Sequence, residues 1–187
     1  MKHFTMTMCA LLFAFAFLLP THQTALAEEF TCRGTLGAIT LDNVRVPSNA
    51  TCTLNGTRLK GTLKVERNAT LNATRINVVG NIQAENAKAV NVTSAVVGGS
   101  IQVKQGVSAR IQSTRINGDL QFDSNRGAIV ATSNTIGGSL QAMKNTGGTS
   151  ITSNRINGNL QCKENRPAPT GRGNVVQGSK EDQCARL

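Results

Sequence analysis

Four cysteines have the most specific chemistry in this sequence. The 187-residue chain has 5 cysteines, and the four outside its N-terminal apolar run are Cys32, Cys52, Cys162 and Cys184. Metal sites and redox pairs typically place two cysteines in a CxxC arrangement, and the sequence has no such spacing. Disulfide bonding is therefore the expected chemistry, and four cysteines permit three pairings.

Carboxylates are the next residues that could do chemistry. Paired carboxylates act as acid and base in glycoside hydrolysis, and clusters of them bind calcium. The best candidate pair among the 10 Asp and Glu residues is Asp119 and Asp123, beside Arg115. We expect these groups to be solvated outward charges that pair with Lys104 and its neighbours instead of forming a catalytic pair.

Basic residues outnumber acidic ones, 20 to 10. Arg58, Arg115 and Arg155 recur at matching positions of an internal repeat and are the candidate polyanion-binding residues. Such a charge could attract anionic envelope polymers, lipopolysaccharide or DNA. It could also serve only to keep a β-surface soluble and unaggregated. We expect no specific nucleic-acid site, because no aromatic residues are interleaved for base stacking.

The first 27 residues indicate a secretory signal peptide. Lys2 and His3 precede the apolar run Cys9–Leu19, and Ala25-Leu26-Ala27 forms an A-x-A cleavage site. The run is too short for a membrane span, which needs about 20 residues. We therefore predict cleavage after Ala27, export to the periplasm, cell surface or medium, and no transmembrane segment in the mature chain.

Cleavage would change the chemistry that the chain can perform. Both histidines, His3 and His22, lie in the predicted signal, and the chain has no Trp or Tyr. The mature chain would lack every Ser-His-Asp or Cys-His nucleophilic pair and every His-ligated metal. We accordingly predict no catalytic, metal-binding or cofactor-binding residue and no enzymatic activity.

A repeat of 19–20 residues must position the remaining candidates. Six segments, from Lys60–Val65 to Asn157–Cys162, align without gaps around one column of glycines. The glycines are Gly61, Gly80, Gly99, Gly118, Gly138, Gly158 and Gly178. Aliphatic residues stand two positions before each of the seven glycines and two positions after the first six, with a polar residue three positions after each glycine. This period of two indicates strands and no helix.

The repeat predicts an all-β fold, a parallel β-helix or β-solenoid of about seven coils. A β-sandwich is the competing fold, but its strands rarely keep one register over six units. We expect a single domain over residues 28–187. Within it, residues 28–57 would form an N-terminal cap, residues 58–165 the regular coils and residues 166–187 a C-terminal cap.

Coils about 4.8 Å apart would bring equivalent positions together. An amide ladder is expected along Lys64, Gln83, Gln102, Gln121, Gln141 and Gln161. Turns with left-handed backbone are expected at Asn49, Asn68, Asn86, Asn125, Asn145 and Asn165. The glycine column should mark corners with positive φ or close approach. The succession Glu85, Lys104, Asp123 should pair charges across strands.

The same stacking chooses between the disulfide pairings. Cys32 and Cys52 are separated by one coil, as are Cys162 and Cys184. We therefore predict the bridges Cys32–Cys52 and Cys162–Cys184, one at each end, where terminal coils have only one neighbour.

The last part of the chain resembles the ending of a group of uncharacterised exported bacterial β-solenoid proteins. The shared pattern is QCKxN-PAPTG-GN-V-G-K-x-QC, and the segment that contains it is Asn159–Cys184. The resemblance implies a bacterial origin and no known activity, so it assigns no functional residue.

An outward column at Thr74, Thr93, Gln112, Thr132 and Thr152 resembles the Thr ladders of ice-binding proteins. The residues two positions on, Thr114, Asn134 and Asn154, are expected to face outward as well. Because this second column is not made of threonines throughout, the β-propensity of threonine is the expected explanation of the Thr column.

These observations favour a secreted, non-enzymatic solenoid, monomeric, with a structural or surface-binding role in the cell envelope or extracellular space. A self-assembling, amyloid-like matrix protein is the first alternative, since Gln and Asn columns at this period resemble curli-type repeats. A polysaccharide-acting β-helix enzyme is the second alternative.

Overall fold

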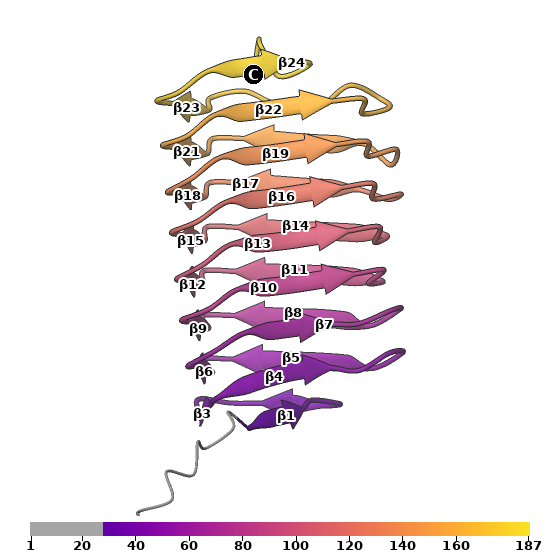
Figure 1. Cartoon of the computed structure of the whole chain (residues 1–187), viewed down its shortest axis with the longest axis vertical. Coiled ribbons are helices and arrows are strands. Elements are labelled where there is room, and N and C mark those ends of the chain that lie inside the picture. Colours follow the sequence, from indigo (N-terminus) through magenta and orange to yellow (C-terminus); the bar gives the residue numbers. More distant parts are fainter. Residues whose placement is uncertain (1–27) are drawn as a thin grey trace, which may run out of the picture.

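The computed structural model describes residues 28–187, and the predicted signal peptide lies outside the described part. Within residues 28–187 the chain forms 24 strands and no helix, wound into a straight rod (Figure 1). Every turn except the last contributes strands to three sheets, called here sheets A, B and C. All strand pairs are parallel.

The sheets run the length of the rod. Sheet A contains β1 (Glu29–Thr31), β4 (Asn43–Val46), β7 (Leu63–Val65), β10 (Ile82–Glu85), β13 (Ile101–Lys104), β16 (Leu120–Asp123), β19 (Leu140–Met143), β22 (Leu160–Lys163) and β24 (Lys180–Asp182). Sheet B contains β2 (Thr35–Leu36), β5 (Thr51–Asn55), β8 (Thr70–Thr74), β11 (Ala89–Thr93), β14 (Ser108–Gln112), β17 (Ile129–Thr132) and β20 (Thr149–Thr152). Sheet C contains β3 (Thr40–Leu41), β6 (Arg58–Leu59), β9 (Asn77–Val78), β12 (Val96–Val97), β15 (Arg115–Ile116), β18 (Thr135–Ile136), β21 (Arg155–Ile156) and β23 (Val175–Val176).

The parallel β-solenoid predicted from the repeat is confirmed. The rod has about eight turns, because residues 28–57 already add strands to the same three sheets as the regular coils. The register follows the repeat, with Ile82 opposite Ile101 and Gln83 opposite Gln102. Both predicted disulfides are present, with Cα–Cα distances of 5.6 Å for Cys32–Cys52 and 5.2 Å for Cys162–Cys184.

Aliphatic columns fill the interior. Val, Leu and Ile side chains from all three sheets form one continuous core, in which the largest buried side chain is Phe122. No single turn can enclose its own apolar residues, so each turn buries its apolar residues against the next. The core is therefore continuous along the axis and can be exposed only at the two ends.

Corners between the sheets are made by residues with left-handed backbone. Between sheets A and B these are Asn49, Asn68, Asn86, Gln105, Ser124, Lys144 and Glu164. The prediction of left-handed turns therefore holds for Asn49, Asn68 and Asn86 and is wrong for the other three asparagines. Asn125, Asn145 and Asn165 each come one residue after the left-handed position and point into the core, where they are buried.

The corner between sheets B and C also differs from the sequence prediction. Thr114, Asn134 and Asn154, predicted to face outward, are 1% exposed. Each follows a serine with positive φ, for example Ser133 before Asn134. One left-handed residue interrupts the strand alternation, so the next side chain turns inward.

The glycine column marks close approach and not positive φ. None of its seven members is among the residues with positive φ. A Cβ on Gly80 would lie 2.7 Å from the carbonyl oxygen of Gly61 in the turn below. Gly138 is similarly blocked by the Asp119 side chain. Glycine is needed here because stacked corners leave no room for a side chain.

Candidate functional site

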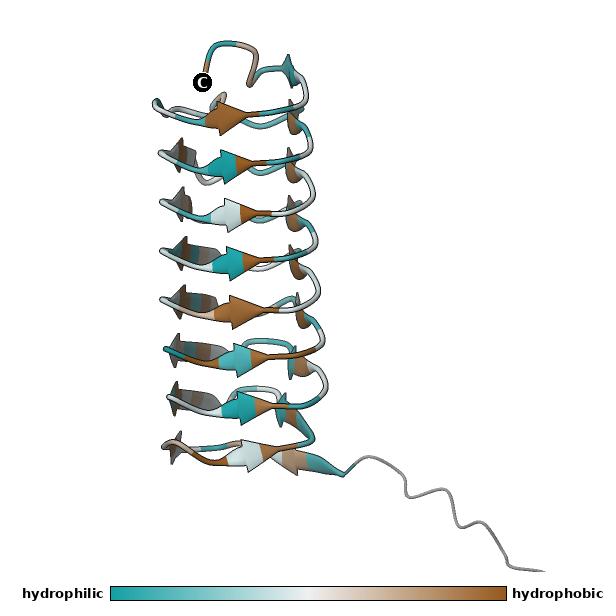
Figure 2. Cartoon of the chain, turned by 90° about the vertical axis from the view of Figure 1, so that its left-hand side faces the viewer, coloured by the Kyte–Doolittle hydropathy of each residue, from teal (hydrophilic) through white to brown (hydrophobic). Residues whose placement is uncertain are grey.

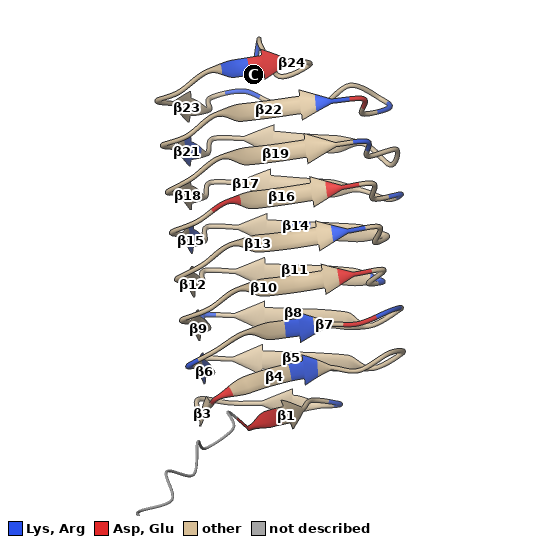
Figure 3. Ribbon diagram, viewed as in Figure 1, with Lys and Arg blue, Asp and Glu red and all other residues tan. Residues whose placement is uncertain are grey.

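Acidic residues are confined to one side of the rod. The ten carboxylates belong to Glu28, Glu29, Asp42, Glu66, Glu85, Asp119, Asp123, Glu164, Glu181 and Asp182. All lie on sheet A, on the corners that flank it, or at the ends (Figure 3). Sheets B and C and the corner between them contain no Asp or Glu. From the second turn on, this part comprises residues 51–60, 70–79, 89–98, 108–117, 128–137, 148–157 and 168–178, and we call its surface the cationic side.

Seven basic residues belong to the cationic side: Arg58, Lys60, Arg75, Arg110, Arg115, Arg155 and Arg172. Among the described residues, the other twelve basic residues share the remaining surface with all ten acids. Most of the net positive charge of residues 28–187 therefore lies on the cationic side. The separation of charge follows the sheets and not the sequence, because every turn of the chain passes through both kinds of surface.

The three predicted arginines occupy one outward column of sheet C. The register runs Arg58, Asn77, Val96, Arg115, Thr135, Arg155, Val175. Figure 2 faces this column, with hydrophilic positions at β6, β15 and β21 and apolar ones at β12 and β23. Turns about 4.8 Å apart place Arg58 about 14 Å from Arg115, and Arg115 about 10 Å from Arg155.

The guanidinium groups of this column are exposed and are not neutralised by carboxylates. Arg58, Arg115 and Arg155 are all exposed, and within residues 28–187 none forms an ion pair. The Nε atom of Arg115 donates to Asn117 Oδ1 at 3.5 Å, a neutral partner on the same face. Lys60 differs, since its Nζ lies 3.1 Å from Asp42 Oδ1 at the N-terminal end.

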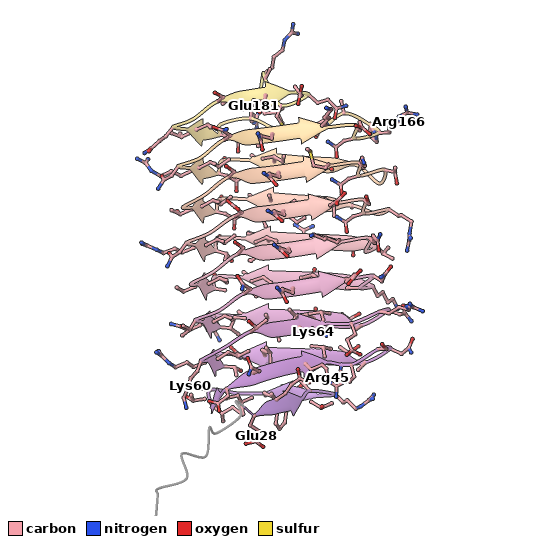
Figure 4. All side chains as sticks on the ribbon, in the orientation of Figure 1. Glu28, Arg45, Lys60, Lys64, Arg166 and Glu181 are labelled. Carbon is pink, nitrogen blue, oxygen red and sulfur yellow. A yellow bond between two sulfur atoms is a disulfide. The ribbon has the colours of Figure 1, made fainter. Side chains whose placement is uncertain are left out.

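On sheet A, in contrast, basic side chains form ion pairs with carboxylates. Arg45 Nε donates to Glu29 Oε1 at 2.7 Å, and Arg45 Nη1 donates to Glu66 Oε1 at 3.4 Å. The bond to Glu29 raises the pKa of Arg45. The Ser48 backbone N–H, which donates to Glu66 Oε2 at 3.0 Å, lowers the pKa of Glu66. Arg45 and Lys64 lie on the face of sheet A near the N-terminal end (Figure 4).

A shallow depression of about 330 Å³ lies on sheet A beside this network. Its charged lining residues are Lys64, Glu66, Arg67, Glu85 and Lys104, three basic and two acidic. The expected succession Glu85, Lys104, Asp123 is present in the register. No ion pair forms between these three side chains in the described structure. The depression thus mixes both signs of charge with an excess of one cation, unlike the surface of sheets B and C, which has no carboxylates.

The structure does not bring the candidate acids together. Asp119 directly precedes β16 and Asp123 is the last residue of that strand, which places them about 13 Å apart for four residues of extended strand. Asp119 Oδ1 accepts a bond from the Ser139 backbone N–H at 2.8 Å. Asp123 Oδ1 accepts one from Ser124 Oγ at 2.8 Å. Asp119 therefore joins two successive turns at the corner between sheets C and A. The two carboxylates do not form an acid and base pair.

The Gln and Thr columns keep their expected register. Hydrogen bonds join only the upper part of the Gln column, from Gln141 Nε2 to Gln161 Oε1 at 3.0 Å and from Gln161 Nε2 to Glu181 Oε2 at 2.8 Å. The Thr column lies on the outer face of sheet B, interrupted by Gln112. Arg110, two residues earlier on the same strand, also breaks the regular Thr array that an ice-binding surface would need.

Comparisons with protein-family models, with curated proteins and with solved structures find no match for this chain. Among residues 28–187 no three His, Cys, Asp or Glu side chains are placed to hold a metal ion. The same residues contain no helix long and apolar enough to cross a membrane. The surface itself must therefore supply the argument for a function.

The repeat predicts the arginine column but not the surface without carboxylates that surrounds it. The missing signal was the position of the acids within each repeat. Between the residue preceding each sheet B strand and the end of the following sheet C strand, every turn lacks Asp and Glu. That pattern is visible in the sequence once the strand boundaries are known.

Proposed function

We propose that this chain is an exported, non-enzymatic β-solenoid that binds an anionic polymer of the cell envelope or matrix through its cationic side. The observation that carries the proposal is the absence of carboxylates from sheets B and C. Ordinary solubility needs charges of both signs interspersed on a surface. A surface that retains arginines but excludes acids creates an extended positive potential, which favours long anionic partners.

Arginine suits this role better than lysine. Six of the seven basic residues on the cationic side are arginines. The guanidinium group binds carboxylate, sulfate and phosphate groups through two parallel N–H donors. Anionic polymers repeat such groups along an extended chain, and a rigid rod presents guanidinium groups at fixed intervals along its axis. The polymer would lie along sheet C, crossing Arg58, Arg115 and Arg155 in turn.

The disulfides support the exported location in this proposal. Disulfides persist in oxidising compartments such as the periplasm and the extracellular space. Cys32–Cys52 and Cys162–Cys184 use all the cysteines outside the predicted signal peptide. An anionic envelope or matrix polymer would be present in those same compartments.

Binding to heparin, a soluble sulfated polymer, tests the proposal directly. The test variant carries Arg58→Gln, Arg115→Gln and Arg155→Gln. The matched control carries Lys104→Gln, Lys144→Gln and Lys163→Gln, which removes the same charge from exposed positions on sheet A and its corner. Affinity is measured for each protein over a range of salt concentrations, together with the unfolding midpoint.

The arginine variant is expected to lose roughly tenfold or more in affinity, about 1.4 kcal/mol. Its dependence on salt should also become shallower, because fewer counterions are released on binding. The lysine control should retain most of the affinity and salt dependence. Equal losses in the two variants would show that net charge alone attracts the polymer, and the proposed site on sheet C would be wrong.

A further inference from the structure

The N-terminal end of the rod leaves the core open. Phe30, Leu36, Ile39 and Leu41 stand at inward positions of the first turn, since Phe30 is opposite Val44, Leu36 opposite Leu54 and Leu41 opposite Leu59. Ile39 belongs to the same layer, because its carbonyl accepts the Arg58 backbone N–H at 2.8 Å. Equivalent side chains in later turns are buried, but Phe30 is 39% exposed and Ile39 44% exposed.

Strand edges surround this open core. β1, β2 and β3 are the terminal strands of sheets A, B and C. An edge strand leaves backbone N–H and C=O groups that can pair with a strand from another chain. The end also has a small depression, in which Phe30, Thr40 and Leu41 are bordered by the carboxylates Glu28 and Asp42. An occupant that fits must therefore supply both apolar side chains and strand edges arranged around them.

The C-terminal end is closed to the same kind of contact. The inward positions of β24 hold Lys180, opposite Leu160, and Asp182, opposite Cys162. Beyond sheet B's last strand, Pro167 and Pro169 lack the N–H groups that an added strand would need. Residues 183–187 turn over the end, where Leu187 packs against the core. A head-to-tail stack would have to bury Lys180 and Asp182 against the apolar first turn.

We propose that the N-terminal end binds the N-terminal end of a second copy, forming a two-fold symmetric dimer. Another first turn offers the same open core and the same strand edges, and the closed C-terminal end offers neither. A two-fold axis across the rods makes the facing strands antiparallel, with β1 meeting β1. Because each copy has only one open end, the assembly closes at two and cannot grow into a fibre.

Charge at this end permits the contact. Glu28, Glu29 and Asp42 are balanced there by Arg33, Arg45 and Lys60. Ion pairs join Glu29 to Arg45 at 2.7 Å and Asp42 to Lys60 at 3.1 Å. Glu28 and Lys60 lie at this end of the rod (Figure 4). Two copies of a strongly basic protein repel each other at most surfaces, and the locally neutral end avoids that repulsion.

The dimer should be reversible. The end of one narrow turn is small beside the roughly 1,200–2,000 Å² that stable interfaces bury. Concentration therefore decides the population of the dimer, and the processed N-terminus must be free of residues 1–27. This expectation replaces the monomer predicted from the sequence.

Sedimentation velocity over a wide concentration range tests the inference on protein exported and processed by a Gram-negative host, with its N-terminus read by mass spectrometry. The test variant carries Phe30→Asp and Ile39→Asp. The control carries Val79→Asp and Val175→Asp, which alters two similarly exposed apolar residues, 52% and 55%, away from the end. Wild type and control should dimerise with rising concentration, and the end variant should need a roughly tenfold or higher concentration.

Hydrogen exchange supplies a measurement that needs no mutation. Amides of residues 28–42 should exchange more slowly as concentration rises, while those of residues 180–187 should not change. A protein that stays monomeric, or whose exchange at residues 28–42 ignores concentration, would overturn the inference. So would open-ended fibres, or a dimer weakened by the valine control and not by the end variant.

Discussion

Asn145 shows how a polar side chain is accommodated inside the solenoid. Its Nδ2 donates to Phe122 O at 3.1 Å and to Asn165 Oδ1 at 2.9 Å. Its Oδ1 accepts from the backbone N–H and the Nδ2 of Asn125 at 3.0 and 2.9 Å. An amide has two donors and two acceptor lone pairs, so every one is used. Burial of this group is therefore not penalised by an unmade hydrogen bond.

Thr149, unlike Asn145, is a buried polar residue whose side chain has no hydrogen-bond partner in the described structure. Its side chain occupies an inward position opposite Ile129 and is 4% exposed. Within residues 28–187 no hydrogen-bond partner reaches its buried Oγ1. Replacing the hydroxyl by a methyl group keeps the shape and removes an unpaired buried polar atom.

We predict that Thr149→Val raises the free energy of unfolding by about 1 kcal/mol. Urea denaturation of the variant and of wild type measures the difference. Thr152→Val, on the half-exposed outer face of the same strand, serves as the control and should stay within about 0.5 kcal/mol of wild type. A destabilised Thr149→Val protein would mean that the hydroxyl has a partner.

At the scale of elements, buried Asn residues form two ladders in the C-terminal half. One runs through Asn125, Asn145 and Asn165 beside sheet A, and the other through Asn134, Asn154 and Asn174 beside sheet C. Earlier turns have Ala or Gly at the first of these corners, for example Ala69 and Gly106. The repeat lengthens from 19 to 20 residues where the first ladder begins. The longer corner contains backbone groups that the Asn side chains satisfy.

Removal of a central ladder residue should be costly. We predict that Asn145→Ala lowers the free energy of unfolding by about 2–4 kcal/mol, because it leaves donors of Asn125 and the carbonyl of Phe122 without partners at roughly 1–3 kcal/mol each. Denaturant unfolding again supplies the measurement, with the exposed Asn157→Ala as the matched control. Similar losses in both variants would show that the ladder adds no stability of its own.

The repeat was sufficient to predict the strands, their parallel register, the aliphatic columns and both disulfides. It could not predict which way the corner residues point. Direction there depends on single left-handed residues such as Ser133 and Lys144, and serine and lysine carry no strong preference for that conformation. Asn134 and Asn145 were therefore assigned to the wrong surroundings, although their place in the repeat was correct.

At the scale of the molecule, charged residues are distributed unevenly around the rod axis, and exposed apolar residues are distributed unevenly along it. Around the axis, the acids lie on sheet A, on the corners that flank it or at the ends, while sheets B and C carry no acids. Along the axis, the N-terminal end exposes apolar residues and the C-terminal end presents Lys180 and Asp182. In a head-to-head dimer the two rods would share one axis. The cationic sides of the two copies would then form one surface twice as long as that of a single rod. A long polymer could then contact both copies, which raises its apparent affinity.

The two disulfides should act locally on this rod. Each closes a loop of about 20 residues and should contribute about 3 kcal/mol. In a stacked repeat each turn contacts only its neighbours, so the loss of one bridge should loosen the turns next to it. Cys32→Ala with Cys52→Ala should therefore speed amide exchange in β1–β6, and Cys162→Ala with Cys184→Ala in β19–β24. Each variant is the control for the other, measured by hydrogen exchange and mass spectrometry. Uniform acceleration along the whole chain in either variant would show instead that the rod opens as one cooperative unit, and the end bridges would then stabilise every turn equally.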